Sequence, residues 1–100
     1  VERAAVRAAT ITDVVVARHR VVVAGLSSGH VAAWDVATCA ASSSDAPAVT
    51  RVGSAVYALA LNERDDALFC GCDAFVVCYA LRDVCARAGG ATPRHAWRLP

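Results

Sequence analysis

The sequence contains two copies of one pattern, spaced about 45 residues apart. Gly25 and Gly71 are separated by 46 residues, and the aromatic residues that follow them, Trp34 and Tyr79, are separated by 45. Both copies carry runs of β-branched and aliphatic residues bounded by short polar turns, which indicates strands rather than helices. The repeat therefore predicts an all-β protein built from two similar units.

The first unit is expected to span residues 10–52. Valine-rich runs on either side of the turn Arg18-His19-Arg20 predict two strands that are buried on both faces. The small, polar segment from Thr38 to Pro47 predicts a surface loop. The first two expected strands contain the runs 14–16 and 21–23, and a turn is expected at Leu26-Ser27-Ser28-Gly29. The next strands are expected at 30–36 and, at the edge, 48–52.

The second unit is expected to span residues 53–100 and to repeat this order. Its strands are expected at 56–61, 67–71, 75–81 and, as a candidate edge strand, 95–99. A charged turn occupies residues 62–66, and a second loop is expected from Arg82 to Pro93. Residues 1–9 are compatible with a preceding edge strand or linker, or with a short helix.

A period near 40 to 45 residues with four strands in each unit is typical of a propeller blade. The segment Gly25-Leu26-Ser27-Ser28-Gly29-His30-Val31-Ala32-Ala33-Trp34-Asp35-Val36 resembles the third-strand signature of WD40 repeats. Residues 56–61, the charged turn and Leu68-Phe69-Cys70-Gly71 are similar to the first two strands of a following blade. The resemblance covers roughly residues 10–100 and implies a WD40-type β-propeller segment of about two four-stranded blades. Its signature positions are Gly25, Gly29, Trp34, Asp35, Gly71, Asp73 and Tyr79.

The second unit departs from the WD40 pattern more than the first. Tyr79-Ala80 stands where Trp-Asp is usual, and no His precedes the strand that follows Gly53-Ser54-Ala55. The usual Asp of the third-strand turn is Ser28 in the first unit and is retained as Asp73 in the second. Apolar packing is therefore expected to hold the two units together.

Two blades are too few for a closed propeller, which typically has four to eight. They would leave two apolar sheet faces bare, more than soluble monomers normally expose. We therefore expect the chain to belong to a larger propeller, or another protein subunit to cover these faces.

The five cysteines suggest an intracellular protein, in the cytoplasm or the nucleus. Their number is odd and apolar core residues are plentiful, so reduced, buried thiols are favoured over a disulfide framework. The alternatives are a zinc cluster and a redox pair between Cys70 and Cys78 on adjacent strands. The zinc cluster would use Cys70, Cys72, Cys78, Cys85 and His95. The spacing Cys70-x-Cys72 differs from the usual zinc-ligand pairs, so neither a metal nor another cofactor is expected.

Composition and motifs argue against several functions. A chain that is 57% hydrophobic with a net charge of +1 is neither a disordered tail nor strongly basic. No apolar stretch approaches the length of a membrane span. No nucleophile motif, phosphate-binding loop or paired-histidine motif is present, so no enzymatic activity is expected.

The best candidate binding feature is a pair of charged turns. Arg18, His19 and Arg20 occupy the first turn of one unit, and Glu63, Asp65 and Asp66 occupy the same turn of the next. Equivalent turns of adjacent blades lie on one rim, so these residues are expected to be neighbours. They would form either a screened surface pairing or a bipolar patch that orients a protein partner.

The function expected from the resemblance is a non-catalytic scaffold for protein–protein interaction within a multi-protein complex. The short first turn and the Gly71-Cys72-Asp73 turn are also similar to a propeller subunit of the THO mRNA-export assembly. This suggests an alternative, a nucleic-acid-associated propeller of an mRNA processing and export complex. An enzyme would need catalytic residues outside these positions.

Overall fold

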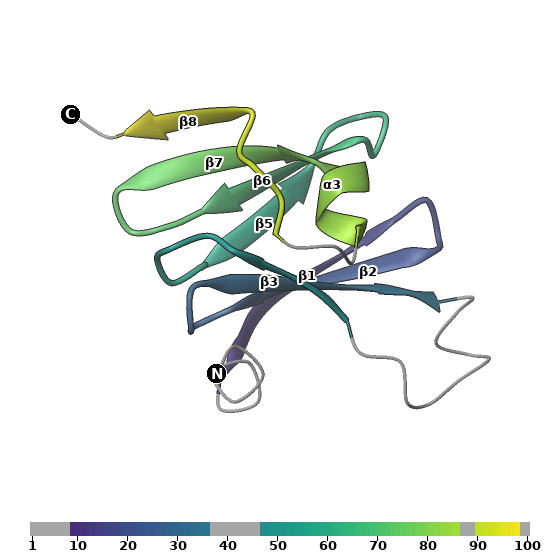
Figure 1. The fold of residues 1–100 in the computed structure, drawn as a ribbon, viewed down its shortest axis with the longest axis horizontal. Coiled ribbons are helices and arrows are strands. Elements are labelled where there is room, and N and C mark those ends of the chain that lie inside the picture. The colour runs from purple at the N-terminus through teal and green to yellow at the C-terminus, as the bar shows by residue number, and fades with distance from the viewer. Residues whose placement is uncertain (1–8, 37–46, 87–89, 99–100) are drawn as a thin grey trace.

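The computed structural model describes residues 9–36, 47–86 and 90–98. This part of the chain forms two four-stranded antiparallel sheets and one short helix (Figure 1). The expected all-β class is confirmed. The remaining residues lie outside the description, including all but Ala9 of the segment 1–9 and all but Pro47 of the loop 38–47.

Each sheet is a simple meander in which neighbouring strands follow one another in the chain. Sheet 1 comprises β1 (Ile11–Ala17), β2 (Val21–Leu26), β3 (His30–Asp35) and β4 (Ala48–Arg51). Sheet 2 comprises β5 (Ala58–Leu61), β6 (Ala67–Gly71), β7 (Phe75–Ala80) and β8 (His95–Arg98). The helix α3 (Leu81–Cys85) follows β7.

The strand expected from Val56 begins two residues later, at Ala58. The backbone N–H of Val56 donates to the Leu26 carbonyl of the other sheet, at 3.2 Å, while Tyr57 N–H donates to Gly71 O at 2.8 Å. Val56 therefore joins the two sheets, which is why it lies outside the β5 ladder.

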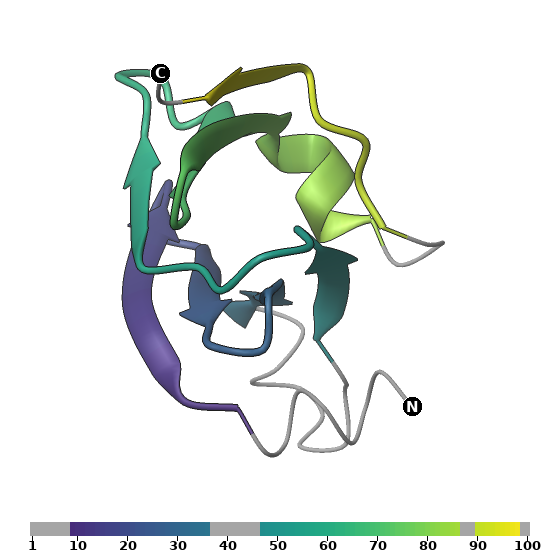
Figure 2. The same ribbon diagram turned by 90° about the vertical axis from the view of Figure 1, so that its left-hand side faces the viewer.

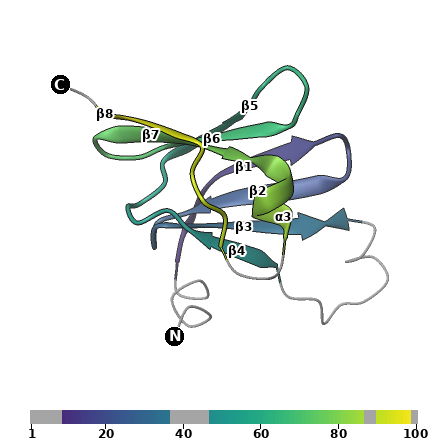
Figure 3. The ribbon, with the colours of Figure 1, turned by 45° about the horizontal axis from the view of Figure 1, so that its top comes forward.

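The loop expected from Arg82 to Pro93 is wrong at its start, where α3 forms. Leu81 and Val84 lie three residues apart on one side of this single turn and are buried, at 6% and 0% exposure. The helix contacts β3, β4 and β7, on the side of the sheet pair away from β1 and β5 (Figures 2 and 3). One turn is too short to show a helical period in the sequence, and its exposed positions resemble a loop.

The two sheets pack face to face around one hydrophobic core, with β1 beside β5. The core comprises Ala17, Val23, Val31, Ala33, Val56, Leu59, Leu68, Cys70, Val77, Tyr79, Leu81 and Val84. Two polar contacts join the sheets where β1 meets β5. Leu59 N–H donates to Asp13 Oδ2 at 2.8 Å, and the Thr12 hydroxyl lies within hydrogen-bond distance of both Gly25 O and Val56 O.

The two sheets have the same internal register. Trp34 pairs with Val22 and Tyr79 pairs with Leu68, and each partner lies three residues before the repeated glycine. The one-residue difference between the copies falls in the following hairpin turn. Residues of β2 and β6 at the same distance before the glycine, and the residues that pair with them, can therefore be treated as equivalent.

The two sheets are stacked in the same orientation, like successive sheets of one stack. As a result, the face that sheet 1 contributes to the core is equivalent to the outer face of sheet 2, and the reverse also holds. Val23 of sheet 1 is in the core, whereas its equivalent, Phe69, stacks on Trp97 with ring centroids 6.3 Å apart. Leu68 of sheet 2 is in the core, whereas its equivalent, Val22, points to the outer face of sheet 1. The face that is buried in one sheet therefore corresponds to the face that is outermost in the other sheet.

The outer faces carry exposed apolar side chains. Val14 and Val16 on β1 are 49% and 53% exposed, so the prediction that this strand is buried on both faces is wrong. The error arises because, among the described residues, no second sheet packs on the outer side of β1. Other exposed large apolar side chains are Ile11, Val36, Tyr57, Val76 and Trp97.

Candidate interaction groove

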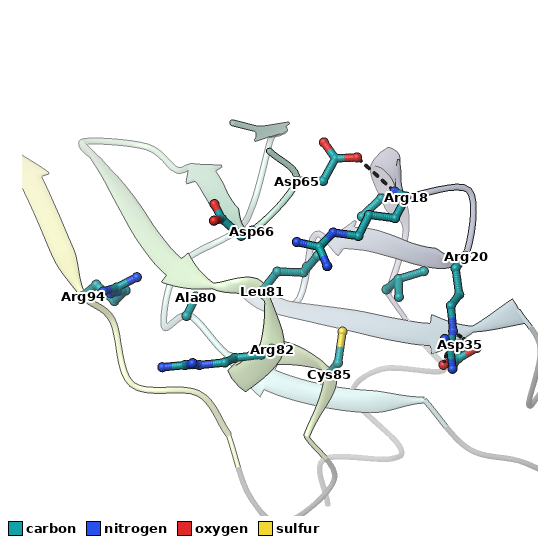
Figure 4. A pocket seen from close by; sticks show the side chains of 12 residues that line it. Arg18, Arg20, Asp35, Asp65, Asp66, Ala80, Leu81, Arg82, Cys85 and Arg94 are labelled. Atoms are coloured by element: carbon teal, nitrogen blue, oxygen red, sulfur yellow. Dashed lines mark hydrogen bonds and ion pairs between the residues drawn. The ribbon is translucent and has the colours of Figure 1, made fainter. Parts of the chain in front are cut away.

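A groove of about 620 Å³ opens where the first turns of the two sheets meet the start of α3 (Figure 4). Its lining is mostly charged around a small apolar floor. The lining residues are Ala17, Arg18, Arg20, Val21, Asp35, Asp65, Asp66, Ala80, Leu81, Arg82, Cys85 and Arg94.

The turn from Arg18 to Arg20 forms one wall of the groove. Arg18 and His19 have positive φ angles of 54° and 56°, and Arg20 N–H donates to Ala17 O at 3.0 Å, as in a type I′ turn. Two consecutive residues other than glycine in this region cost conformational energy, which the surrounding contacts must offset.

The second turn contacts the first through Asp65. Its Oδ2 accepts the backbone N–H of Arg18 at 2.9 Å, while the Arg18 guanidinium lies 3.4 Å from Arg64 O. The structure therefore brings the two turns together, as their equivalent positions predicted. The contact uses the Arg18 backbone rather than a side-chain ion pair.

The acidic turn is held in shape by Asn62. Its side-chain oxygen accepts the N–H groups of Asp66 and Ala67, both at 2.9 Å, and its amide donates to Asp66 Oδ1. Glu63 and His19 are exposed and do not line the groove. The groove thus includes four of the six residues singled out in the sequence.

Arg20 does not pair with the acidic turn. Its Nε donates to both carboxylate oxygens of Asp35, at 3.0 and 3.2 Å, across the β2–β3 hairpin. The side chains are 66% and 34% exposed, so the pair contributes at most about 1 kcal/mol. Asp35, a signature position, therefore has a local structural contact.

Two arginines in the groove were missed in the sequence. Arg82 is the second residue of α3, and its Nε lies 3.9 Å from Oδ1 of the neighbouring Asp83. Arg94 donates its backbone N–H to Cys78 O at 2.8 Å. Both were assigned to or beside a loop, and they meet only because α3 folds back beside the start of β8. Figure 4 shows both side chains at the same end of the groove.

Cys85 also lines the groove. Burial, and then the nearby carboxylate of Asp35, raise the pKa of the Cys85 thiol. A neutral thiol is a poor nucleophile.

Cys70 and Cys78 lie on opposite faces of sheet 2. Cys70 pairs with Val77 in the core, whereas Cys78 pairs with Phe69 on the opposite face. A redox pair between Cys70 and Cys78 is therefore wrong, because side chains that pair across strands share a face and these two do not. Burial, with smaller contributions from Cys72 and Cys78, raises the pKa of Cys70 to about 12. Within the described ranges, no group of three or more His, Cys, Asp and Glu side chains is placed to hold a metal ion.

The remaining signature residues are divided among the hairpin turns, the core and the outer face of sheet 1. Gly29 has φ of +89°, which its tight turn requires and which side chains disfavour. Tyr79 is 1% exposed, and burial, followed by Cys70 and Cys72, raises its pKa to about 12. Trp34 is half-buried, and Asp73 is exposed in its turn.

Comparisons with protein-family models, curated proteins and solved structures found no match to this chain. In the part of the chain that the structure describes, no helix has the length and apolar character needed to cross a membrane.

Proposed function

We propose that this chain is a non-catalytic scaffold for protein–protein interaction, formed by two blades of a WD40-type propeller within an intracellular multi-protein complex. Three features support the propeller assignment: the four-stranded meanders, their shared register, and their stacking in the same sense. Successive propeller blades stack in this way around a ring.

The charged groove is the observation that carries the proposed function. Four arginines and three aspartates surround its floor of small and aliphatic side chains. A groove with this lining suits a peptide segment, because its floor can bind aliphatic side chains and its charges can fix the orientation of the peptide.

The charges in the groove favour an acidic segment. Asp65 and Asp66 already accept hydrogen bonds from the protein, and Arg20 is paired with Asp35. The guanidinium groups of Arg82 and Arg94 lie at the opposite end of the groove from Arg20 and Asp35 (Figure 4). A carboxylate placed there would form charge-assisted hydrogen bonds with both.

The test is the binding of a fluorescent glutamate-rich peptide, followed by anisotropy at low and physiological salt. We expect Arg82→Glu with Arg94→Glu to weaken binding at least about tenfold. The matched control is Arg51→Glu with Arg98→Glu, which changes the same charge at two exposed, equivalent strand positions outside the groove. Equal loss in both pairs would show general electrostatic attraction and would refute a specific groove.

Nucleic-acid association, as in a THO-like export assembly, is the second candidate, favoured by the concentration of arginines in one groove. A short single-stranded RNA probe in the same assay separates the two. Tighter binding of RNA than of the peptide, with steep salt dependence and the same loss in the groove variant, would favour this alternative.

A further inference from the structure

The exposed residues of each outer face are equivalent to buried residues at the interface between the sheets. Val14 pairs with Ala24 and Leu59 pairs with Cys70, and each partner immediately precedes the repeated glycine. Val14 is 49% exposed, whereas its equivalent, Leu59, is 7% exposed. The outer face of sheet 1 thus corresponds to the face through which sheet 2 joins the core.

The same relation holds for the outer face of sheet 2. Val76 pairs with Gly71 and with Trp97, as Val31 pairs with Gly25 and Thr50 in sheet 1. Val31 and Thr50 are 0% and 1% exposed, whereas Val76 and Trp97 are 39% and 51% exposed. The outer face of sheet 2 thus corresponds to the face through which sheet 1 joins the core.

We propose that a second copy of this chain docks head to tail, with the outer face of its sheet 1 on the outer face of sheet 2 of the first copy. The contact continues the internal interface by one more sheet. This proposal rests on the same stacking of sheets that supports the proposed function. The contact between copies does not involve the groove.

The internal interface indicates which residues meet. Val14 and Val16 of the second copy take the places that Leu59 and Leu61 occupy inside one copy, and they lie against the face that carries Phe69. The centre of sheet 1 contributes less, because its alanines are already buried beneath neighbours such as Trp34. The contact is therefore concentrated near β1.

One polar contact of the internal interface is not repeated. The position equivalent to Asp13, whose carboxylate accepts Leu59 N–H, is Ala58. The new contact is consequently more apolar, and association is expected to depend on protein concentration.

Head-to-tail contacts form rings when the rotation closes. The described part of each copy supplies two of the four to eight sheets that a closed propeller typically has.

The test uses size-exclusion chromatography with light scattering across the micromolar range. Val16→Glu blocks the outer face of sheet 1, and Val76→Glu blocks that of sheet 2. Each variant alone is expected to be monomeric, while an equimolar mixture forms a one-to-one complex through the one intact pair of faces. Thr92→Glu, which adds the same charge at an exposed residue between α3 and β8, should assemble like the unmodified chain.

A chain that stays monomeric throughout this range would overturn the proposal. So would association of either variant alone, which would indicate a contact between identical faces. Circular dichroism checks that each variant is folded. Peptide binding in the groove is measured on the monomeric variants, so failure of this contact and failure of the proposed function are distinguishable.

Discussion

Gly25 and Gly71 are equivalent in sequence and register but differ in what covers them, so alanine substitution at each tests the stacking of the two sheets. A Cβ at Gly25 would lie 2.8 Å from Val56 Cγ1 and 3.4 Å from Leu59 Cγ. Val56 is fully buried and β-branched, so it has little freedom to move away. Gly25→Ala therefore forces the sheets apart.

The expected loss follows from two opposing effects. Overpacking a well-filled interface costs about 1–3 kcal/mol. Replacing glycine with alanine also restricts the unfolded chain, which stabilises the folded state by about 0.4–1 kcal/mol. We expect a net loss of about 1–2 kcal/mol, with Tm falling by about 4–8 °C for each kcal/mol in a domain of this size.

Gly71→Ala is the matched control. The nearest atom to its Cβ would be Ala58 Cβ at 3.6 Å, which is an ordinary contact. Its stability should change by less than about 0.5 kcal/mol, or increase slightly. Both variants are compared by urea denaturation in the Val16→Glu background, so that association does not contribute.

A double-mutant cycle identifies the clash. In a Val56→Ala background the offending methyl group is absent, so the added cost of Gly25→Ala should largely disappear. Equal effects at the two glycines, or a full cost of Gly25→Ala without the valine methyl groups, would refute the stacking argument.

Three further perturbations address individual contacts. Asp13→Ala removes the acceptor for Leu59 N–H and should lower the free energy of unfolding by about 1–2 kcal/mol in urea melts; an unchanged midpoint would contradict this role. Burial raises the pKa of Cys70 from 9.0 to about 12, so its thiol favours the folded state fully below pH 9. This stabilisation should be lost as pH rises from 9 toward 12, by up to about 1.4 kcal/mol per pH unit, and Cys70→Val should flatten the profile measured by urea melts. Arg20→Ala should cost at most about 1 kcal/mol and less at high salt, because its pair with Asp35 is exposed; a large, salt-independent loss would show a different role.

Local pattern was sufficient to predict the strands and their order. β6 spans the predicted residues, and the register of Trp34 and Tyr79 matches their spacing from the repeated glycines. Strand pairing in a hairpin is set by a short turn and by alternation along the chain, both of which can be read from adjacent residues.

The candidate site was only partly predictable. The contact between Arg18 and Asp65 followed from placing equivalent turns on one rim. Arg82 and Arg94 were missed because their meeting depends on α3, which forms where Leu81 and Val84 find a buried surface. Nothing local in the sequence distinguishes that turn from a loop.

The sequence by itself determined two similar sheets, their strand order and the residues on each of their faces. Only the tertiary structure decided which face is covered: Val23 is buried while its equivalent, Phe69, lies on an outer face. Alternation divides a strand into two faces but does not say which of them meets another sheet. That choice depends on the stacking of segments far apart in the chain, and the same stacking brings the charged turns together into a groove.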